Sequence, residues 1–253
     1  MIGISEVAGG SSSSHFLDIT SLENLFGAWN EFKKGKERKF EVQQFAMNLE
    51  DNLFELHHKL LVGTYQHAPY ASFFLQDPKL RHIHKASIID RVLHHAIMRS
   101  IEPFFEKGFI FDSYSSRKNK GTHKAVQRFR RFAWKLSRNN TKTVWVLQCD
   151  IRRFFDSVDH GILRSLIRKK IYDEKAINLI AHIIESFHVE ENKGMPLGNV
   201  TSQLFSNIYL DPFDQFIKRI LREKYYVRYA DDFVVLSREK QYLQNLIFVI
   251  NKF

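Results

Sequence analysis

Cysteine is almost absent from this sequence, since Cys149 is the single one among 253 residues. One cysteine excludes an intrachain disulfide and argues against a zinc site built on cysteines. A reducing compartment fits this composition, so we expect a cytoplasmic protein. No basic residue is fixed beside Cys149 in the sequence to activate its thiol, and we therefore interpret it as a packing residue.

Long apolar runs are missing too. No stretch approaches the ~20 apolar residues that a membrane-spanning helix needs, so we expect no membrane contact. Residues 1–15 lack the basic segment followed by an apolar one that marks a signal peptide, and we interpret them as a flexible leader. The 11 glycines form no Walker or Rossmann pattern. After residue 15 the sequence shows no internal repeat and no linker.

The 12 histidines also lack a recognisable metal-binding spacing, because no His-Glu-x-x-His motif occurs. Several form close pairs: His57 with His58, His82 with His84, and His94 with His95. Without cysteines or that motif, structural or surface roles are favoured over metal binding for all of them.

Positive charge is abundant and concentrated in one part of the chain. The net charge is +10, from 38 Lys and Arg against 28 Asp and Glu. Residues 79–142 alone hold 16 Lys and Arg against 4 Asp and Glu, so the rest of the chain is slightly acidic. A basic block beside acidic residues suggests a polyanion held near metal-binding carboxylates, and a solubilising surface gives the same pattern. With 44% hydrophobic residues, the chain can bury the core of one large or two modest domains.

The spacing of apolar residues predicts a mostly helical chain. Thr20 and Glu23 fit a capping box at the start of the first helix. The predicted helices span residues 20–34, 42–61, 87–106, 122–138, 160–171, 175–187, a segment from the 194–199 loop to about 221, and a last one that starts near 239.

The helix predicted over residues 122–138 is amphipathic and basic. Arg128, Arg131 and Lys135 lie on one face, opposite an apolar face. Contact with nucleic acid and a solvated outer surface explain this face equally well, and both interpretations stay open.

Three short strands are predicted, and each lies next to acidic residues. Residues 143–149 predict a buried strand that Asp150 ends, and residues 225–229 and 233–237 predict a hairpin with Asp231 and Asp232 at its turn. Adjacent carboxylates repel each other unless something neutralises them, and a lone Asp pair is also common in surface turns. Asp150 strengthens the case, because carboxylates from two strand ends are suited to bind Mg²⁺ for phosphoryl transfer.

These carboxylates lie within strings that resemble reverse transcriptases. The chain is similar to the group II intron-like branch of that family, and within it to the enzymes of diversity-generating retroelements. The strings occur in the family order over roughly residues 20–237: KLRHIHKASIIDRVLHHAI, FIFDSYSSRKNKGTHKAV, CDIRRFFDSVDH, GMPLGNVTSQLFSN and RYADDFVVL.

The resemblance implies an RNA-directed DNA polymerase of the α+β right-hand fold. Residues 16–142 are then N-terminal helices and fingers, and residues 143–253 are the palm. It implies two Mg²⁺ ions, with Mn²⁺ as a substitute, an RNA template, a DNA or RNA primer, dNTPs and an accessory protein. Such enzymes continue into a primer grip and a thumb, which are absent here, supplied by another chain, or outside this sequence.

Roles for individual residues follow from the same resemblance. Asp150 and Asp231 match the two metal ligands, joined by the carbonyl of Ile151, and Asp232 matches a supporting carboxylate. Phe155 matches the ring that excludes a ribose 2′-hydroxyl, although either Phe154 or Phe155 is expected to be core. Lys85 and Arg117 match basic residues that grip the triphosphate, with three competitors: Arg81, Arg91 and Lys118.

One departure from the family concerns fidelity. Many reverse transcriptases have Pro-Gln-Gly where this chain has Pro196, Leu197 and Gly198, so a polar contact near the nascent base pair is lost. Diversity-generating enzymes share this feature, which implies error-prone copying, in particular opposite template adenines. The alternatives are a group II intron, CRISPR-associated or phage-defence reverse transcriptase, and a non-catalytic RNA-binding scaffold.

Overall fold

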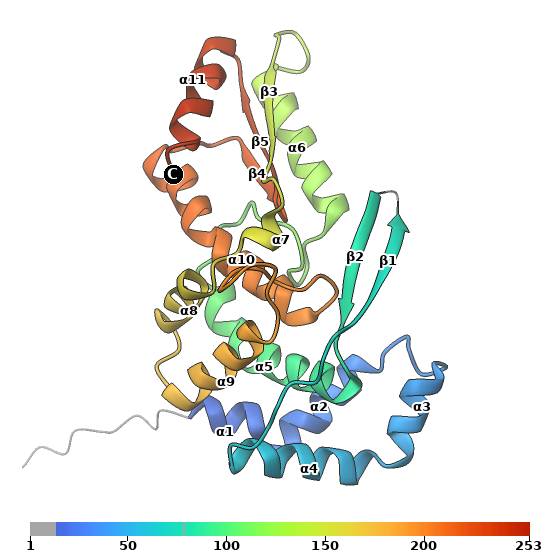
Figure 1. The fold of residues 1–253 in the computed structure, drawn as a ribbon. Helices are drawn as coiled ribbons and strands as arrows, with labels where there is room; N and C mark the ends of the chain where they lie inside the picture. The colour runs from blue at the N-terminus through green and yellow to red at the C-terminus, as the bar shows by residue number, and fades with distance from the viewer. Residues whose placement is uncertain (1–13, 78) are drawn as a thin grey trace, which may run out of the picture.

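The computed structural model describes residues 14–77 and 79–253, and its sheet and helices confirm the α+β class (Figure 1). A three-stranded antiparallel sheet has the order β3-β5-β4, with β3 at Trp145–Asp150, β4 at Tyr226–Tyr229 and β5 at Asp232–Ser237. Helix α6 (Thr122–Leu136) packs on one face of the sheet, and α11 (Lys240–Ile250) packs on the other. Because side chains alternate along a strand, Phe233 faces α11 while Leu236 faces α6.

The prediction of a buried strand before Asp150 was wrong about burial. Strand β3 forms, but Trp145 is 40% exposed and Val146 is 45% exposed. The reason is that α6 packs on β4 and β5 and leaves its face of the edge strand β3 uncovered. The strand also includes Asp150, which pairs with Asp232.

The rest of the chain is a helical body built around the long helix α5 (Ile88–Glu106), which begins at the N-cap Ser87. Its buried residues Leu93, Ile97 and Ile101 belong to the largest apolar core. The other helices are α1 (His15–Thr20), α2 (Leu22–Phe32), α3 (Phe40–Met47), α4 (Leu49–Leu61), α7 (Phe154–Ser157), α8 (His160–Arg168), α9 (Glu174–Glu185), α10 (Val200–Gln215) and the π-helical turn η1 (Phe216–Ile220).

One predicted helix begins later than expected, and another is broken. The segment predicted over 20–34 begins instead at the N-cap Ser21, because Thr20 ends α1 and its hydroxyl donates to the carbonyl of Phe16. The segment predicted over 42–61 is broken at Asn48, whose ψ of 37° is not helical. Of the predicted leader, residues 1–13 lie outside the described residues, whereas Ser14 caps α1 and His15 belongs to it.

A two-stranded hairpin projects from the helical body beside the sheet (Figure 1). Its strands are β1 (Ala71–Asp77) and β2 (Lys79–Lys85), and no strand was predicted here because this segment is largely exposed and shows no regular alternation of apolar and polar residues. The backbone N–H of His84 donates to the carbonyl of Leu197 at 3.0 Å, so the hairpin is tied to the loop before α10. Within the described residues, no helix is long and apolar enough to cross a membrane.

Candidate active site

Three carboxylates converge at the end of the three-stranded sheet. Asp150 on β3 lies opposite Asp232 on β5, and Asp231 occupies the turn that joins β4 to β5. One ligand oxygen from each of the three lies within 4.8 Å of the others. The turn is tight, since Ala230 adopts a left-handed φ of +54°. The structure therefore forms the predicted hairpin, and it places Asp150 beside Asp231 and Asp232.

The carboxylates disfavour one another's charge. Partial burial raises the pKa of the Asp231 carboxyl above its usual value, and the charges of Asp150 and Asp232 raise it further. The positive charge of Arg81 on β2 acts in the opposite direction and lowers that pKa. A bound cation would relieve this repulsion, as the sequence suggested.

The donor set fits magnesium. Mg²⁺ prefers a few carboxylate oxygens and completes its coordination with water and phosphate oxygens. Asp150 and Asp232 are exposed, and Asp231 is partly exposed, so the cluster remains open to a phosphate-bearing ligand. Ile151 follows directly and is half-buried between two apolar cores, which fixes the chain beside Asp150.

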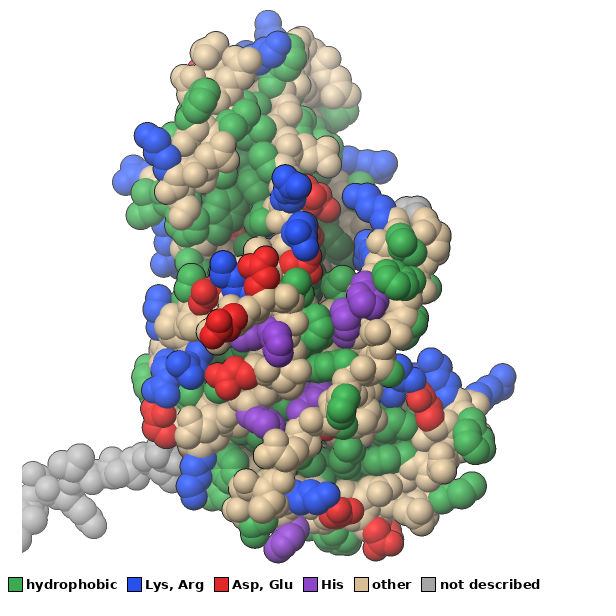
Figure 2. Space-filling model, viewed as in Figure 1, with side chains coloured by type: hydrophobic (Ala, Val, Ile, Leu, Met, Phe, Trp, Pro, Cys, Tyr) green, Lys and Arg blue, Asp and Glu red, His purple; other side chains and the backbone are tan. Residues whose placement is uncertain are grey.

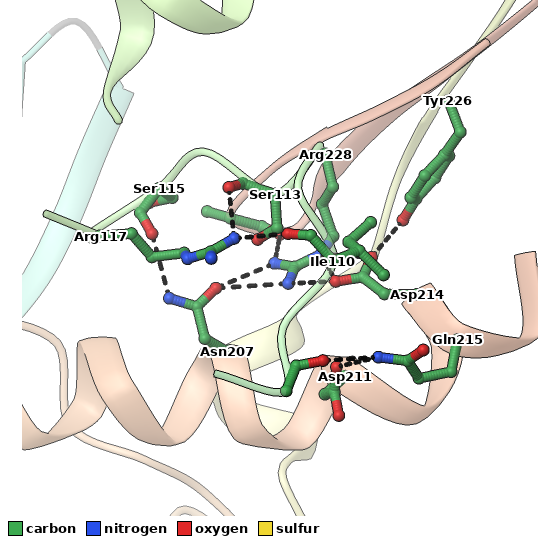
Figure 3. A network of polar contacts seen from close by, with 12 residues as sticks. Ile110, Ser113, Ser115, Arg117, Asn207, Asp211, Asp214, Gln215, Tyr226 and Arg228 are labelled. Carbon is green, nitrogen blue, oxygen red and sulfur yellow. Dashed lines mark hydrogen bonds and ion pairs between the residues drawn. The ribbon is translucent and has the colours of Figure 1, made fainter. Parts of the chain in front are cut away.

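A buried ion pair fixes the strand that leads to the turn (Figure 3). The guanidinium of Arg228 on β4 donates to Asp214 on α10 at 2.7 Å, and both side chains are fully buried. It also donates to the carbonyl of Ala230 at 2.8 Å, next to Asp231. Tyr226 donates its hydroxyl to Asp214 at 2.6 Å. Removing one partner of such a pair leaves an uncompensated buried charge, so these contacts hold the position of the turn.

Hydrogen bonds of Arg228 also connect β4 to the loop before α6. Asn207 on α10 accepts from Arg228 at 3.3 Å and donates to the carbonyl of Ser115 at 3.0 Å (Figure 3). The backbone N–H of Arg228 donates to the carbonyl of Asp112, so this loop lies along β4. The sequence did not predict the pair of Asp214 and Arg228. Its one signal was Arg228 itself, a charged residue inside the apolar string YVRYADDF, which needs a buried partner.

The two basic residues predicted to grip a triphosphate differ in their surroundings. The guanidinium of Arg117 is 5% exposed and donates to Glu106 and to the carbonyls of Ile110 and Ser113. These contacts are structural and orient the side chain into the protein. Lys85 is about one-third exposed and pairs with Glu41 at 2.6 Å. No described contact joins Arg117 or Lys85 to the carboxylates. The competing residue Arg81 lies close enough for its charge to lower the pKa of Asp231.

The two phenylalanines after Asp150 differ in burial, although their rings lie 5.4 Å apart and both contact the main core. Phe154 is 3% exposed and packs in the main core, where its ring lies 6.1 Å from that of Tyr209. Phe155 is only partly buried, and its carbonyl accepts from the backbone N–H of Met195 at 2.8 Å. The core member of the pair is therefore Phe154.

The loop that contains Leu197 and Gly198 is packed against the hairpin. Gly198 has a φ of +112°, and a Cβ there would lie 3.0 Å from Cγ2 of Ile83 on β2. Glycine is thus required both by the backbone conformation and by the close approach. Leu197 is partly exposed and presents only its aliphatic side chain.

The basic face of α6 is divided. Arg131 and Lys135 are exposed, as a surface for nucleic acid requires. Arg128 instead donates to Asp112 at 2.8 Å and lies 4.3 Å from the ring centroid of Phe132. Its charge is therefore largely committed to the protein.

Two carboxylates at the turn between β4 and β5 lie beside a third at the end of β3, on an antiparallel sheet next to a helical body. This arrangement is that of the right-hand α+β polymerase fold. The chain belongs to the family described as reverse transcriptase (RNA-dependent DNA polymerase), whose sequence model matches residues 76–253.

Similar proteins include intron-encoded ones. Protein YkfC of Escherichia coli (strain K12) is 27% identical over 222 residues, which cover 72% of this chain and 58% of YkfC. The group II intron-encoded protein LtrA of Lactococcus lactis subsp. cremoris is 26% identical over 180 residues, which cover 68% of this chain and 29% of LtrA. This chain thus spans only part of the length of both relatives.

A solved structure shows the same fold. A chain of the partial Cas6-RT-Cas1–Cas2 complex matches with a TM-score of 0.55 at 19% identity, over 95% of this chain and 43% of that chain. At this identity the match supports the fold alone.

Proposed function

We propose that this protein is an RNA-directed DNA polymerase that extends a DNA or RNA primer with dNTPs on an RNA template. The observation that carries the proposal is the convergence of Asp150, Asp231 and Asp232 in a chain of the reverse transcriptase family. Residues 16–142 then correspond to N-terminal helices and fingers, and residues 143–253 to the palm. The intact carboxylate set argues against a non-catalytic scaffold.

Asp150 and Asp231 would hold two Mg²⁺ ions, with Asp232 and the carbonyl of Ile151 in support; Mn²⁺ suits the same oxygen ligands. The ions would supply charge stabilisation to the attacking and leaving oxygens of nucleotidyl transfer. Around them, the chain orients the substrate. The partly exposed ring of Phe155 would exclude a 2′-hydroxyl, and Lys85 would reach a phosphate if it left Glu41. Arg81 is better placed than the buried Arg117 for this task.

The finer role that we propose is error-prone copying within a diversity-generating retroelement, with an accessory protein as a partner. Its support is Leu197, which offers no hydrogen bond at the loop before α10, together with the strings that resemble those enzymes. A pocket without that polar contact selects nucleotides mainly by shape and by base pairing, which discriminates less. The match to LtrA favours mobility of a group II intron as the second candidate.

The test is primer extension on an RNA template with dNTPs and Mg²⁺, followed by sequencing of the cDNA. The parent should extend the primer and misincorporate most often opposite template adenines. Leu197→Gln should lower that error rate while it keeps extension. Equal error spectra from two active enzymes would remove Leu197 as a determinant of fidelity, and a low error rate in the parent would favour the intron role.

A further inference from the structure

A chain of ring contacts, of which the outermost is stacked and the others tilted, runs along one face of the β1–β2 hairpin. Phe74 and His82 are cross-strand partners, and their rings lie 4.5 Å apart with an angle of only 12°. The ring of His82 is 4.3 Å from that of His84, which is in turn 4.5 Å from that of Phe187 after α9. These four residues are called the ring ladder below. Its outer end is open, because His82 is exposed and Phe74 is 66% exposed.

The inner end of the ring ladder is anchored in the protein. Phe187 contacts the ring of Tyr70 at 5.7 Å, and Tyr70 contacts His67 at 4.7 Å. His67 stacks on the fully buried His94 at 5.3 Å. A rigid inner end keeps the outer rings in place at a low cost in conformational entropy. Burial lowers the pKa of His84, so its ring stays neutral at neutral pH.

The hairpin separates rings from charges. Because side chains alternate across a strand, the antiparallel register places Phe74, His82 and His84 on one face of the hairpin. Arg81 and Lys85 project from the opposite face, and the face with the ring ladder has no Lys or Arg among its described residues. The face with the ring ladder is therefore suited to contacts with bases rather than with phosphates.

The ring ladder lies beside the candidate active site. The backbone N–H of His84 donates to the carbonyl of Leu197, and the carbonyl of His84 accepts from the side chain of Asn199 at 3.3 Å. Figure 2 shows histidine side chains on the face where the hairpin approaches the acidic side chains around the end of the sheet. Any strand that enters the site along this face of the hairpin passes the ring ladder.

We propose that Phe74 and His82 form a stacking platform for unpaired bases of the single-stranded RNA template, with His84 and Phe187 as its support. Flat rings bind any base through its π-face, so the platform suits a template of varied sequence. The inference rests on the proposed function and adds residues that hold the template before it reaches the carboxylates. Phe74 is 66% exposed and therefore contributes little to a core, which argues against a purely structural role.

The experiment measures binding without catalysis. Single-stranded RNA with a fluorescent label is titrated with the protein in the absence of divalent ions, and anisotropy gives the affinity. A matched RNA has abasic sites in place of its bases. The variant Phe74→Ala with His82→Ala should bind the base-bearing RNA about 5- to 100-fold more weakly than the parent does. Its affinity for the abasic RNA should equal that of the parent, and its salt dependence should not change.

Two further variants give the controls. Tyr172→Ala removes an exposed ring, 80% exposed, that lies outside the ring ladder, and it should not affect RNA affinity. Phe74→Tyr with His82→Phe keeps the stack and should restore binding. An equal loss of affinity for base-bearing and abasic RNA would overturn the inference, as would an unchanged affinity of the Phe74→Ala, His82→Ala variant for base-bearing RNA. Extension assays on the parent separate the two proposals, because an inactive parent with base-dependent binding contradicts only the proposed function.

Discussion

Asp150 lies directly opposite Asp232 in the antiparallel pair of β3 and β5. This register brings together two stretches of sequence that lie about 80 residues apart, and it places Asp231 in the adjoining turn. A slip of one residue would turn the side chain of Asp150 to the opposite face of the sheet. The site therefore depends on this register and on the fully buried pair of Arg228 and Asp214, which holds the turn between β4 and β5.

Sugar selection should depend on Phe155. Phe155→Ala removes a partly exposed ring and opens space for a 2′-hydroxyl, so the ratio of ribonucleotide to deoxyribonucleotide incorporation should rise by about 10-fold or more. Competition between the two nucleotides during primer extension measures the ratio. An active variant with unchanged selectivity would contradict this role.

Phe154→Ala is the matched control for that experiment. It removes a ring that is 3% exposed in the main core, so it should lower the free energy of unfolding by about 3–5 kcal/mol. In the fraction that remains folded, the nucleotide ratio should change less than in Phe155→Ala, because the ring of Phe155 is kept although it loses its contact with Phe154. Denaturant unfolding of both variants distinguishes the two positions.

The exposed basic residues of α6 should contribute to RNA affinity through phosphates. Affinity for single-stranded RNA should fall with salt on a log–log scale, with a slope of about −0.7 per phosphate neutralised. Arg131→Gln with Lys135→Gln should make that slope shallower by about 1.4. Arg128→Gln should change it less, because Arg128 is paired with Asp112. Identical slopes for the parent and the double variant would show that this face of α6 is a solvated surface that does not bind RNA.

The buried His94 should make stability depend on pH. Burial lowers its pKa to about 3, and the charges of His67, His95 and Arg91 act in the same direction. The unfolded chain binds this proton near pH 6.5, more readily than the folded chain does, so stability is lost as the pH falls below about 6.5. The loss from His94 alone should reach about 2 kcal/mol at pH 5.

His94→Leu should reduce this loss between pH 7 and pH 5, since the group that titrates only after unfolding is gone. His123→Leu, which removes an exposed histidine of α6, is the control and should keep the pH dependence of the parent. Denaturant unfolding at each pH gives the free energies. Equal pH dependence in the parent and in His94→Leu would show that His94 is not the group responsible.

The acidic end of the sheet was predictable because its signals are local. Apolar β-prone segments end at Asp150 and flank Asp231 and Asp232, so the strands and their acidic tips follow from neighbouring residues. The helix that begins at Ser87 has an equally local signal in its N-cap.

The features that the sequence did not predict depend on contacts between segments far apart in the chain. The β1–β2 hairpin is exposed along most of its length and is held at its base by Leu197, about 115 residues away, so its own sequence shows no burial pattern. The partnership of Arg228 with Asp214 and the commitment of Arg117 to Glu106 are equally invisible before the fold is known. Histidines set aside as structural or surface residues include His82, which the ring ladder places at an exposed site.

The most direct test of the carboxylate site is primer extension by Asp231→Asn. Asp156→Asn is the control: it also removes one negative charge near the site, but Asp156 pairs with the exposed Arg153 in an ion pair of 2.9 Å. We expect extension on an RNA template with Mg²⁺ to fall at least about 1000-fold for Asp231→Asn, because charge stabilisation in such sites contributes several orders of magnitude. Binding of the RNA should stay within about twofold, because its phosphates are neutralised elsewhere. Asp156→Asn should retain extension. Undiminished extension by Asp231→Asn would contradict the assignment of the site.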